Sequence, residues 1–175
     1  AALTGHLLFS TLHTNDAAGA IPRLIDMGVE PFLISSAANA FMAQRLVRKI
    51  CPKCKEKDKK FTSKTKDRLK KILENLSPED KKALPPEKDW QLYQGKGCKD
   101  CYQGYKGRVG IFEIMAISEE IKRLISKDVS SSVIRKKAIE QGMVTMQQDG
   151  IIKALRGVTT LEEVFRVTTE REEQF

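Results

Sequence analysis

Four cysteines arranged as two Cys-x-x-Cys pairs are the residues whose type and spacing point most directly to chemistry. Cys51 and Cys54 form the first pair, and Cys98 and Cys101 form the second. A pair with this spacing can close a tight turn that presents two thiolates to one tetrahedral metal ion. Four thiolates suit Zn²⁺, and an ion with four protein ligands has no open position for a substrate. We therefore predict a structural zinc site rather than a catalytic one.

The stretch that separates the two pairs is longer than in most zinc ribbons. Its 43 residues, 55–97, exceed the usual spacing of about 15 to 20, so we expect an inserted element there. Three other uses of the cysteines stay open. Two disulfides disagree with a cytosolic chain, a redox-active pair lacks its usual structural surroundings, and no other feature supports an iron–sulfur cluster.

Basic residues gather in the same part of the chain. The formal charge is +8, from 31 basic and 23 acidic residues, and residues 53–82 alone hold eleven lysines and Arg68. Such an excess indicates either a solvated surface or a site for nucleic acid or anionic lipid. We favour the solvated surface, and we expect lysines near the cysteines to help keep the thiolates ionised.

Composition and the lack of targeting signals limit which class of protein the chain can belong to. Apolar residues make up 41% of the chain and charged residues 31%, as in an ordinary globular protein. No apolar run of about 18 residues predicts a membrane span, and no signal peptide opens the sequence, so we expect a cytoplasmic location. The sequence starts with Ala1 and not with Met, which we interpret as part of a longer protein.

The first fifty residues alternate between strand and helix patterns. The apolar residues 6–12 predict a buried strand of a parallel sheet. A helix over 17–27 follows, in which Pro22 should cause a kink or a restart. A second helix should begin at Pro31, and residues 45–50 are either a strand or a helix end. The predicted apolar face of the second helix is Ile34, Ala37, Ala38, Phe41 and Met42.

From Cys51 to Gly110 the sequence is rich in lysine, proline and glycine, which predicts a small separate module. Leucine and isoleucine at 69, 72, 73 and 76 mark one amphipathic helix in it, and Ser77 is a start signal for another. Strand character returns over 108–114. Further helices are predicted over 119–126, from Ser130–Ser132 to Gly142, over 146–156, and after a capping box at Thr160–Glu163.

Segments outside the cysteine pairs form an ordered set of motifs. They are Thr4–Asp16 with both histidines, Arg23–Leu33, Gln44–Leu46 before the first pair, Gly104–Glu113 after the second, and Thr160–Val164 near the end. In this order they resemble the type II secretion and type IV pilus-assembly ATPases (GspE/PulE/PilB) over nearly the whole chain. The cysteines match the assembly or export branch, because the retraction branch of that family lacks them.

The resemblance implies a fold class and an order of domains. The class is α/β: the C-terminal part of a RecA-like nucleotide-binding domain over 1–50, a four-cysteine zinc module with its lysine-rich insert over 51–107, and a returning strand with a helical C-terminal tail over 108–175. The implied protein is a homohexamer on the cytoplasmic face of the inner membrane. There it acts with membrane platform proteins of a secretion or pilus machine. Apart from the resemblance, the lysine-rich insert makes anionic lipid a further expected partner.

Four residues outside the cysteine pairs acquire roles from the resemblance. His6 and His13 belong to the histidine box, near the γ-phosphate, where an imidazole can sense phosphate. Arg108 is expected near the nucleotide, because an arginine can pair with phosphate through two N–H groups, and Arg45 is a second candidate. The alternatives are histidines held by backbone groups, an exposed surface arginine at 108 and an ion pair at 45. Thr160 and Glu163 are expected to be structural.

One motif of nucleotide-hydrolysing enzymes is absent from the sequence. No Gly-x-x-x-x-Gly-Lys-Ser/Thr occurs, and Gly95–Lys96–Gly97 has neither its spacing nor its hydroxyl. That loop supplies the N–H groups that hold phosphate and the hydroxyl that binds Mg²⁺. We therefore expect ATP and Mg²⁺ to bind only in a longer protein, and the chain alone not to hydrolyse ATP.

Two functions of other classes stay open. One is a free-standing zinc module that binds nucleic acid, and the other is a domain that only docks on a membrane-embedded partner. The basic segment holds few aromatic residues that could stack on bases, and no helix with base-reading side chains follows the second cysteine pair. Nucleic acid is therefore the less favoured partner.

Overall fold

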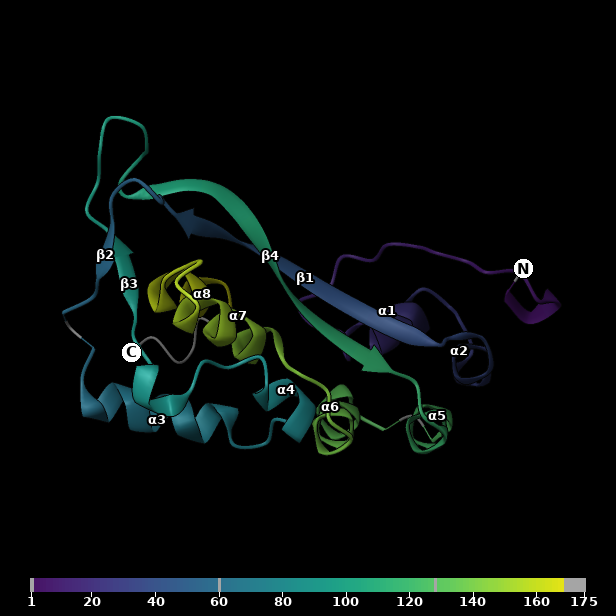
Figure 1. The fold of residues 1–175 in the computed structure, drawn as a ribbon. Helices are drawn as coiled ribbons and strands as arrows, with labels where there is room; N and C mark the ends of the chain where they lie inside the picture. The colour runs from purple at the N-terminus through teal and green to yellow at the C-terminus, as the bar shows by residue number, and fades with distance from the viewer. Residues whose placement is uncertain (1, 60, 128, 169–175) are drawn as a thin grey trace. The chain divides into compact units, whose positions relative to one another are not determined.

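The computed structural model describes residues 2–59, 61–127 and 129–168, and it combines helices with strands (Figure 1). The mixed α/β class predicted from the sequence is confirmed. The described residues fall into two compact units, each of which is built from two stretches of the chain. Unit 1 comprises Ala1–Ala43 and Glu113–Met143, and unit 2 comprises Gln44–Phe112 and Val144–Phe175.

The two longest strands, β1 (Ala40–Ile50) and β4 (Tyr105–Ala116), pair in a two-stranded sheet and run in opposite directions (Figure 1). Side chains of β4 alternate between core and solvent: Ile111, Glu113 and Met115 are buried, whereas Phe112 and Ile114 are exposed. This period of two is what a strand produces. The strand predicted over 108–114 is confirmed, and residues 45–50 are the end of β1.

Unit 1 contains the start of β1, the end of β4 and helices, of which the longer ones each bury an isoleucine. Its helices are η1 (Ala2–Thr4), α1 (Ala20–Asp26), α2 (Pro31–Ala37), α5 (Glu119–Ser126) and α6 (Ser131–Glu140). Helix α2 packs on α5, and α5 packs on α6, where Ile34, Ile121 and Ile134 are buried. The predicted start of α2 at Pro31 is confirmed. Helix α5 covers the predicted range 119–126, and the Ser118 hydroxyl caps it by accepting the Ile121 N–H at 3.3 Å.

A buried carboxylate of β4 also belongs to unit 1. Glu113 is 1% exposed, and its Oε1 accepts the Ala17 N–H at 2.9 Å. Both of its oxygens accept from Arg135 Nη1 on α6 at 3.2 Å. The ion pair compensates a charge that would otherwise be costly to bury.

The strand predicted over 6–12 is not formed. Residues 6–14 have neither helix nor strand assigned, and the side chains of Leu7, Leu8 and Phe9 are 80%, 62% and 87% exposed. A buried parallel strand takes its hydrogen bonds and its packing from neighbouring strands. No segment among the described residues pairs with 6–12, so its apolar pattern stays without the partners that it needs.

Two predictions about the following helices were also wrong. Helix α1 begins only at Ala20, so Pro22 lies in its first turn, where a missing N–H costs no intrahelical hydrogen bond and no kink is needed. Helix α2 ends at Ala37, and Ala38 is already extended. Phe41 and Met42, predicted on a helix face, therefore lie on β1.

Unit 2 contains the insert between the cysteine pairs and the last two helices. Its further elements are β2 (Lys55–Lys57), α3 (Ser63–Leu73), α4 (Pro78–Lys81), η2 (Glu87–Asp89), β3 (Tyr93–Gly95), α7 (Met146–Leu155) and α8 (Leu161–Thr168). Strands β2 and β3 pair in antiparallel orientation, with Lys55 opposite Gly95. The predicted start at Ser77 is confirmed, because its hydroxyl caps α4 by accepting the Asp80 N–H at 3.0 Å.

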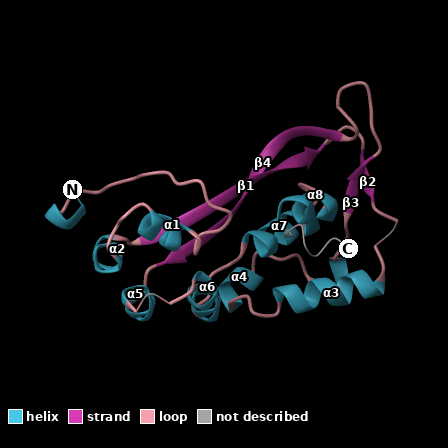
Figure 2. Ribbon diagram, turned by 180° about the vertical axis from the view of Figure 1, so that it is seen from behind, coloured by secondary structure: helices cyan, strands magenta, loops and turns pink. Residues whose placement is uncertain are grey.

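The insert packs on the C-terminal helices rather than extending into solvent. Helix α3 lies beside α7 (Figure 2), and Leu69 and Leu73 join Ile151, Leu155 and Val164 in one buried cluster. Residues 55–97 and 144–168 therefore share a core. The three-part division at residues 50 and 107 follows the sequence motifs and stays a prediction.

Candidate metal centre

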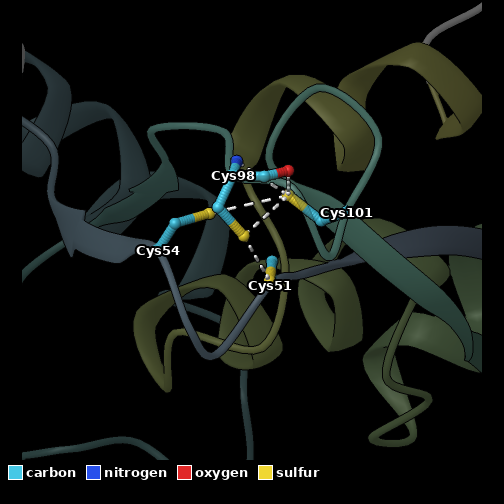
Figure 3. Close-up of side chains that lie close together, drawn as sticks. All are labelled: Cys51, Cys54, Cys98 and Cys101. Carbon is cyan, nitrogen blue, oxygen red and sulfur yellow. Dashed lines mark hydrogen bonds between the residues drawn. The ribbon is translucent and has the colours of Figure 1, made fainter.

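The four cysteine sulfurs meet in unit 2 (Figure 3). The Sγ atoms of Cys51 and Cys98 are 3.9 Å apart, those of Cys54 and Cys101 are 3.7 Å apart, and those of Cys98 and Cys101 are 3.6 Å apart. All four Sγ atoms lie within 4.8 Å of one another. The predicted four-cysteine cluster is therefore present, although its members stand far apart in the sequence.

These distances fit one tetrahedral ion. Four thiolates at about 2.3 Å from a zinc ion place neighbouring sulfurs roughly 3.8 Å apart, close to the three observed separations. A disulfide would bring two sulfurs to about 2.05 Å, and all four cysteines are free. An all-sulfur donor set suits zinc or iron, and a multi-iron cluster would spread its thiolates over several ions. The four residues could thus hold a single metal ion.

Each cysteine pair closes its own turn at the end of a strand. Cys51 follows β1 directly, and the Cys54 N–H donates to the Cys51 carbonyl at 3.3 Å. In the second pair the Cys101 N–H donates to the Cys98 carbonyl at 3.2 Å, and the Cys98 N–H donates to Cys101 Sγ at 3.3 Å. Both pairs thus present their sulfurs from the same kind of tight turn.

Backbone contacts bring the two turns together. The Cys51 N–H donates to the Gly104 carbonyl at 2.9 Å, and the Lys96 N–H donates to the Cys54 carbonyl at 3.0 Å. Gly95 and Gly104 approach so closely that a Cβ on either would overlap the backbone of the other, and Gly104 also has a φ of +83°. Glycine is needed at both positions, because any side chain would force the turns apart.

The thiol pKa values differ within the cluster. Desolvation raises the pKa of Cys54 to about 12. At Cys101 desolvation acts in the same direction, but hydrogen bonds from the Cys98 backbone and thiol, from Cys54 and from the Gly104 N–H outweigh it, and the pKa falls to about 7. Cys101 thus ionises more readily than Cys54, and a bound dication would favour the loss of protons from its thiol ligands.

An ion pair joins the two turns at the surface, and the sequence analysis missed it. Lys53 Nζ donates to Asp100 Oδ2 at 2.8 Å. Both residues occupy the third position of their Cys-x-x-Cys pair, so opposite charges at matching positions were the signal that could have revealed the contact. With side chains 64% and 34% exposed, the pair adds at most about 1 kcal/mol.

The other predicted site residues lie outside the sulfur cluster. His6 and His13 are exposed in unit 1, and His6 Nδ1 is 3.1 Å from the Thr4 hydroxyl. Arg108 is exposed on β4, and Arg45 is half-buried on β1, both in unit 2. Within the part of the chain that the structure describes, no group of metal-ligating side chains other than the four cysteines is found. The nucleotide roles of these four residues stay predictions.

A second polar cluster, also missed, lies beside the strands that lead into the site. Glu163 of α8 is fully buried, and it pairs with Arg48 of β1 and Arg166 of α8, each at 2.8 Å. Desolvation opposes ionisation of Glu163, but the hydrogen bonds from both arginines and from the Arg48 N–H outweigh it and lower its pKa to about 2. No local sequence pattern connects Arg48 with Glu163, because the contact spans 115 positions.

Helices of the described residues are too short or too polar to cross a membrane. That finding concerns the described segments alone.

Curated relatives with this sequence pattern are ATPases and proteins of secretion systems. The chain is 42% identical over 172 residues to a "Type IV pilus assembly ATPase PilB" of Myxococcus xanthus, covering 94% of this chain and 27% of that protein. It is 44% identical over 171 residues to a "Type II secretion system protein E" of Pseudomonas aeruginosa, with coverages of 97% and 31%. It is 41% identical over 178 residues to a "Type II secretion system ATPase E" of Vibrio cholerae, with coverages of 97% and 31%.

The chain thus spans less than a third of the length of these relatives. The model of one protein family, described as "Type II/IV secretion system protein", matches residues 1–166. That match takes in all four cysteines, both histidines and the buried Glu163. The resemblance noted from the sequence motifs is confirmed: the chain belongs to the type II/IV secretion system protein family.

Proposed function

We propose that the chain is the metal-bearing, C-terminal part of a hexameric ATPase that powers type IV pilus assembly or type II secretion. The observation that carries the proposal is the cluster of four sulfurs, all within 4.8 Å of one another, inside a chain that the family model matches over residues 1–166. Relatives named as pilus-assembly ATPases and as a type II secretion ATPase match it at similar identity. That similarity favours neither machine over the other.

The proposed metal is zinc, and its role is structural. Four thiolates complete its coordination, so no position stays open for water or substrate. The ion would hold together the ends of β1, β2, β3 and β4, because each cysteine pair joins or adjoins two of these strands. Zinc therefore stabilises unit 2, while the loop that binds the phosphates is assigned to another part of the parent ATPase.

The first test is a metal and activity assay of the 175-residue chain. Purified without added metal, it should carry one zinc ion per chain by mass spectrometry and release no phosphate from ATP above the blank. The reason is that the sequence provides four thiolates but no phosphate-binding loop. Iron in place of zinc would refute the proposed ion, and sustained ATP turnover by the chain would refute the assignment of catalysis elsewhere.

His6, His13, Arg108 and Arg45 are proposed to serve the nucleotide site of the parent ATPase. The histidines would sense the γ-phosphate, and the arginines would pair with phosphate. The support is their position in the motifs shared with the family, together with the exposure of His6, His13 and Arg108.

In the parent ATPase, Arg108→Ala should weaken nucleotide binding or turnover by about tenfold or more, since one charge-assisted hydrogen bond contributes roughly 1.5–3 kcal/mol. Lys106→Ala is the matched control, because Lys106 is an exposed cation on the same strand. Nucleotide titration and steady-state kinetics measure both variants. Equal behaviour of Arg108→Ala and wild type would remove Arg108 from the site.

The proposed partners are further copies of the ATPase and the inner-membrane platform of a secretion or pilus machine, on the cytoplasmic face of the membrane. The exposed lysines of α3 make anionic lipid a further proposed partner. Light scattering of the parent ATPase tests the hexamer, and flotation with anionic against neutral vesicles tests the lipid. A protein that stays monomeric with bound nucleotide would contradict the proposed hexamer. Equal flotation with anionic and neutral vesicles would contradict the proposed lipid partner.

A further inference from the structure

The spacing of the two cysteine pairs depends on the strands that adjoin them. Cys51 follows the last residue of β1, and β4 begins at Tyr105, shortly after Cys101. A shift of β1 against β4 would therefore move the first pair against the second. Whatever fixes these two strand ends at this point also fixes the geometry of the sulfur cluster.

One short segment, residues 158–163, holds the end of β1 through four hydrogen bonds. The Ile50 N–H donates to the Val158 carbonyl at 2.9 Å, and the Thr159 hydroxyl donates to the Arg48 carbonyl at 2.7 Å. Glu163 then accepts the Arg48 N–H at 2.9 Å and its guanidinium at 2.8 Å. The backbone of β1 and the side chain of Arg48 are therefore both hydrogen-bonded just before the first cysteine pair.

The same segment also holds the start of β4. The Tyr105 hydroxyl lies 3.0 Å from the Thr160 hydroxyl. The guanidinium of Arg48 stacks over the Tyr105 ring at 4.2 Å from its centroid. We call these three residues, Arg48, Tyr105 and Glu163, the clamp. The clamp joins the end of β1 ahead of the first cysteine pair, the start of β4 behind the second pair, and the first turn of α8.

The clamp is more than a helix cap. In a capping box the glutamate would reach back to the N–H of Thr160. Here the Glu163 N–H does donate to the Thr160 hydroxyl at 3.3 Å, but the carboxylate turns to Arg48 and Arg166. Glu163 and Thr159 are each 0% exposed, and both hydrogen-bond to Arg48 of β1, the strand that leads into the first cysteine pair.

We infer that Glu163 is a positioning residue for the metal centre, acting through Arg48 and Tyr105, and that metal binding and the docking of α8 are coupled. This inference rests on the proposed function, since it requires that the cysteines bind zinc. Coupling between two sites is reciprocal. The clamp should therefore raise the affinity for zinc, and zinc should protect α8.

The first experiment measures zinc affinity by competition with a chelating dye. Glu163→Gln should bind Zn²⁺ about tenfold more weakly than wild type, the lower end of what outer-shell partners contribute. Glu162→Gln is the matched control, because Glu162 is exposed on the same turn of α8, and it should bind as wild type does. Tyr105→Phe keeps the ring under Arg48 but removes the hydroxyl, so it should lose affinity by a smaller factor.

The second experiment runs in the opposite direction. Hydrogen exchange of the α8 amides should accelerate when a chelator removes zinc from the wild-type chain, while exchange in α5 and α6 changes less. In Glu163→Gln the α8 amides should exchange at a rate that depends little on zinc. A helix that was merely stabilised by its ion pairs would show no zinc dependence in either protein.

The outcomes separate the inference from the proposed function. A chain that binds zinc with equal affinity in wild type, Glu163→Gln and Tyr105→Phe overturns the inference alone. A wild-type chain that binds no zinc overturns both. If Glu163→Gln fails to fold, Tyr105→Phe decides: weaker zinc binding by a folded Tyr105→Phe supports the clamp, and unchanged binding refutes it.

Discussion

Replacing Cys98 by serine is expected to lower the zinc content of the chain and to destabilise unit 2 by about 3–5 kcal/mol. A serine hydroxyl does not supply the thiolate that zinc binds, so three of the four ligands stay. A structural zinc ion contributes roughly 10–16 kcal/mol of apparent binding free energy in zinc-finger peptides. Losing about a third of it, about 3–5 kcal/mol, removes a large share of the roughly 5–15 kcal/mol by which a small domain is stable.

The effect should be this large because the sulfurs tie together elements with little stability of their own. Strands β2 and β3 pair over only Lys55–Lys57 and Tyr93–Gly95, directly between the two cysteine pairs. A two-stranded sheet of this size is marginal in water. The metal would tie together the strand ends at the cysteine pairs. It would act there together with the hydrogen bond from the Cys51 N–H to the Gly104 carbonyl.

Thermal unfolding followed by circular dichroism, with metal content from mass spectrometry, measures this effect. Lys99→Ser is the matched control, because it places the same residue beside Cys98 at an exposed position, and it should melt as wild type does. Treatment of the wild-type chain with a chelator should lower its melting temperature at least as much as Cys98→Ser does, because it removes the ion completely. Full zinc content and an unchanged melting curve in Cys98→Ser would contradict the metal centre.

Features with a local cause could be predicted from the sequence. Two cysteines separated by two residues can close a metal-binding turn wherever they occur, and the sulfur cluster follows from two such turns. Helix starts have the same local character: Pro31 opens α2, Ser77 caps α4 and Ser118 caps α5. In each case the side chain or ring acts on the first turn that follows it.

Features that depend on distant partners could not be predicted in this way. The apolar residues 6–12 have a strand pattern, but a strand needs neighbours, and none of the described residues pairs with them. The pattern at Thr160–Glu163 predicted a capping box, but only the bond to the Thr160 hydroxyl is present. The Glu163 carboxylate instead accepts a hydrogen bond from Arg48. The fold brings Arg48 beside it, and the separation of the two residues in the sequence does not predict this contact.

The second large effect concerns Glu163 and acid. The pKa of Glu163 is lowered from an ordinary 4.5 to about 2 in the folded chain, so the folded state holds its carboxylate ionised. The resulting stabilisation is complete above the unfolded pKa and is lost as the pH falls from about 4.5 through about 2. The difference of about 2.5 units, at 1.36 kcal/mol each, corresponds to about 3 kcal/mol of unfolding free energy.

Glu163→Gln should therefore be less stable than wild type by about 3 kcal/mol at pH 6, because an amide accepts weaker hydrogen bonds from Arg48 and Arg166 than a carboxylate does. The difference in unfolding free energy between wild type and Glu163→Gln should become smaller as the pH falls. Between pH 5 and pH 3 linkage predicts that wild type loses about 2 kcal/mol more than the variant. Urea unfolding at both pH values measures the two gaps.

Protons also compete with zinc for the thiolates below neutral pH, so acid sensitivity alone would not identify Glu163. Glu162→Gln resolves this, because the wild type, this control and Glu163→Gln carry the same four cysteines. When a chelator removes zinc from all three proteins before the urea titration, metal release no longer contributes to the gap, and only Glu163→Gln lacks the buried carboxylate. Two results would show that the Arg48–Glu163–Arg166 cluster does not hold the ionised carboxylate in place. In one, the difference in unfolding free energy between Glu163→Gln and wild type stays constant from pH 5 to pH 3. In the other, Glu162→Gln differs from wild type in the same way.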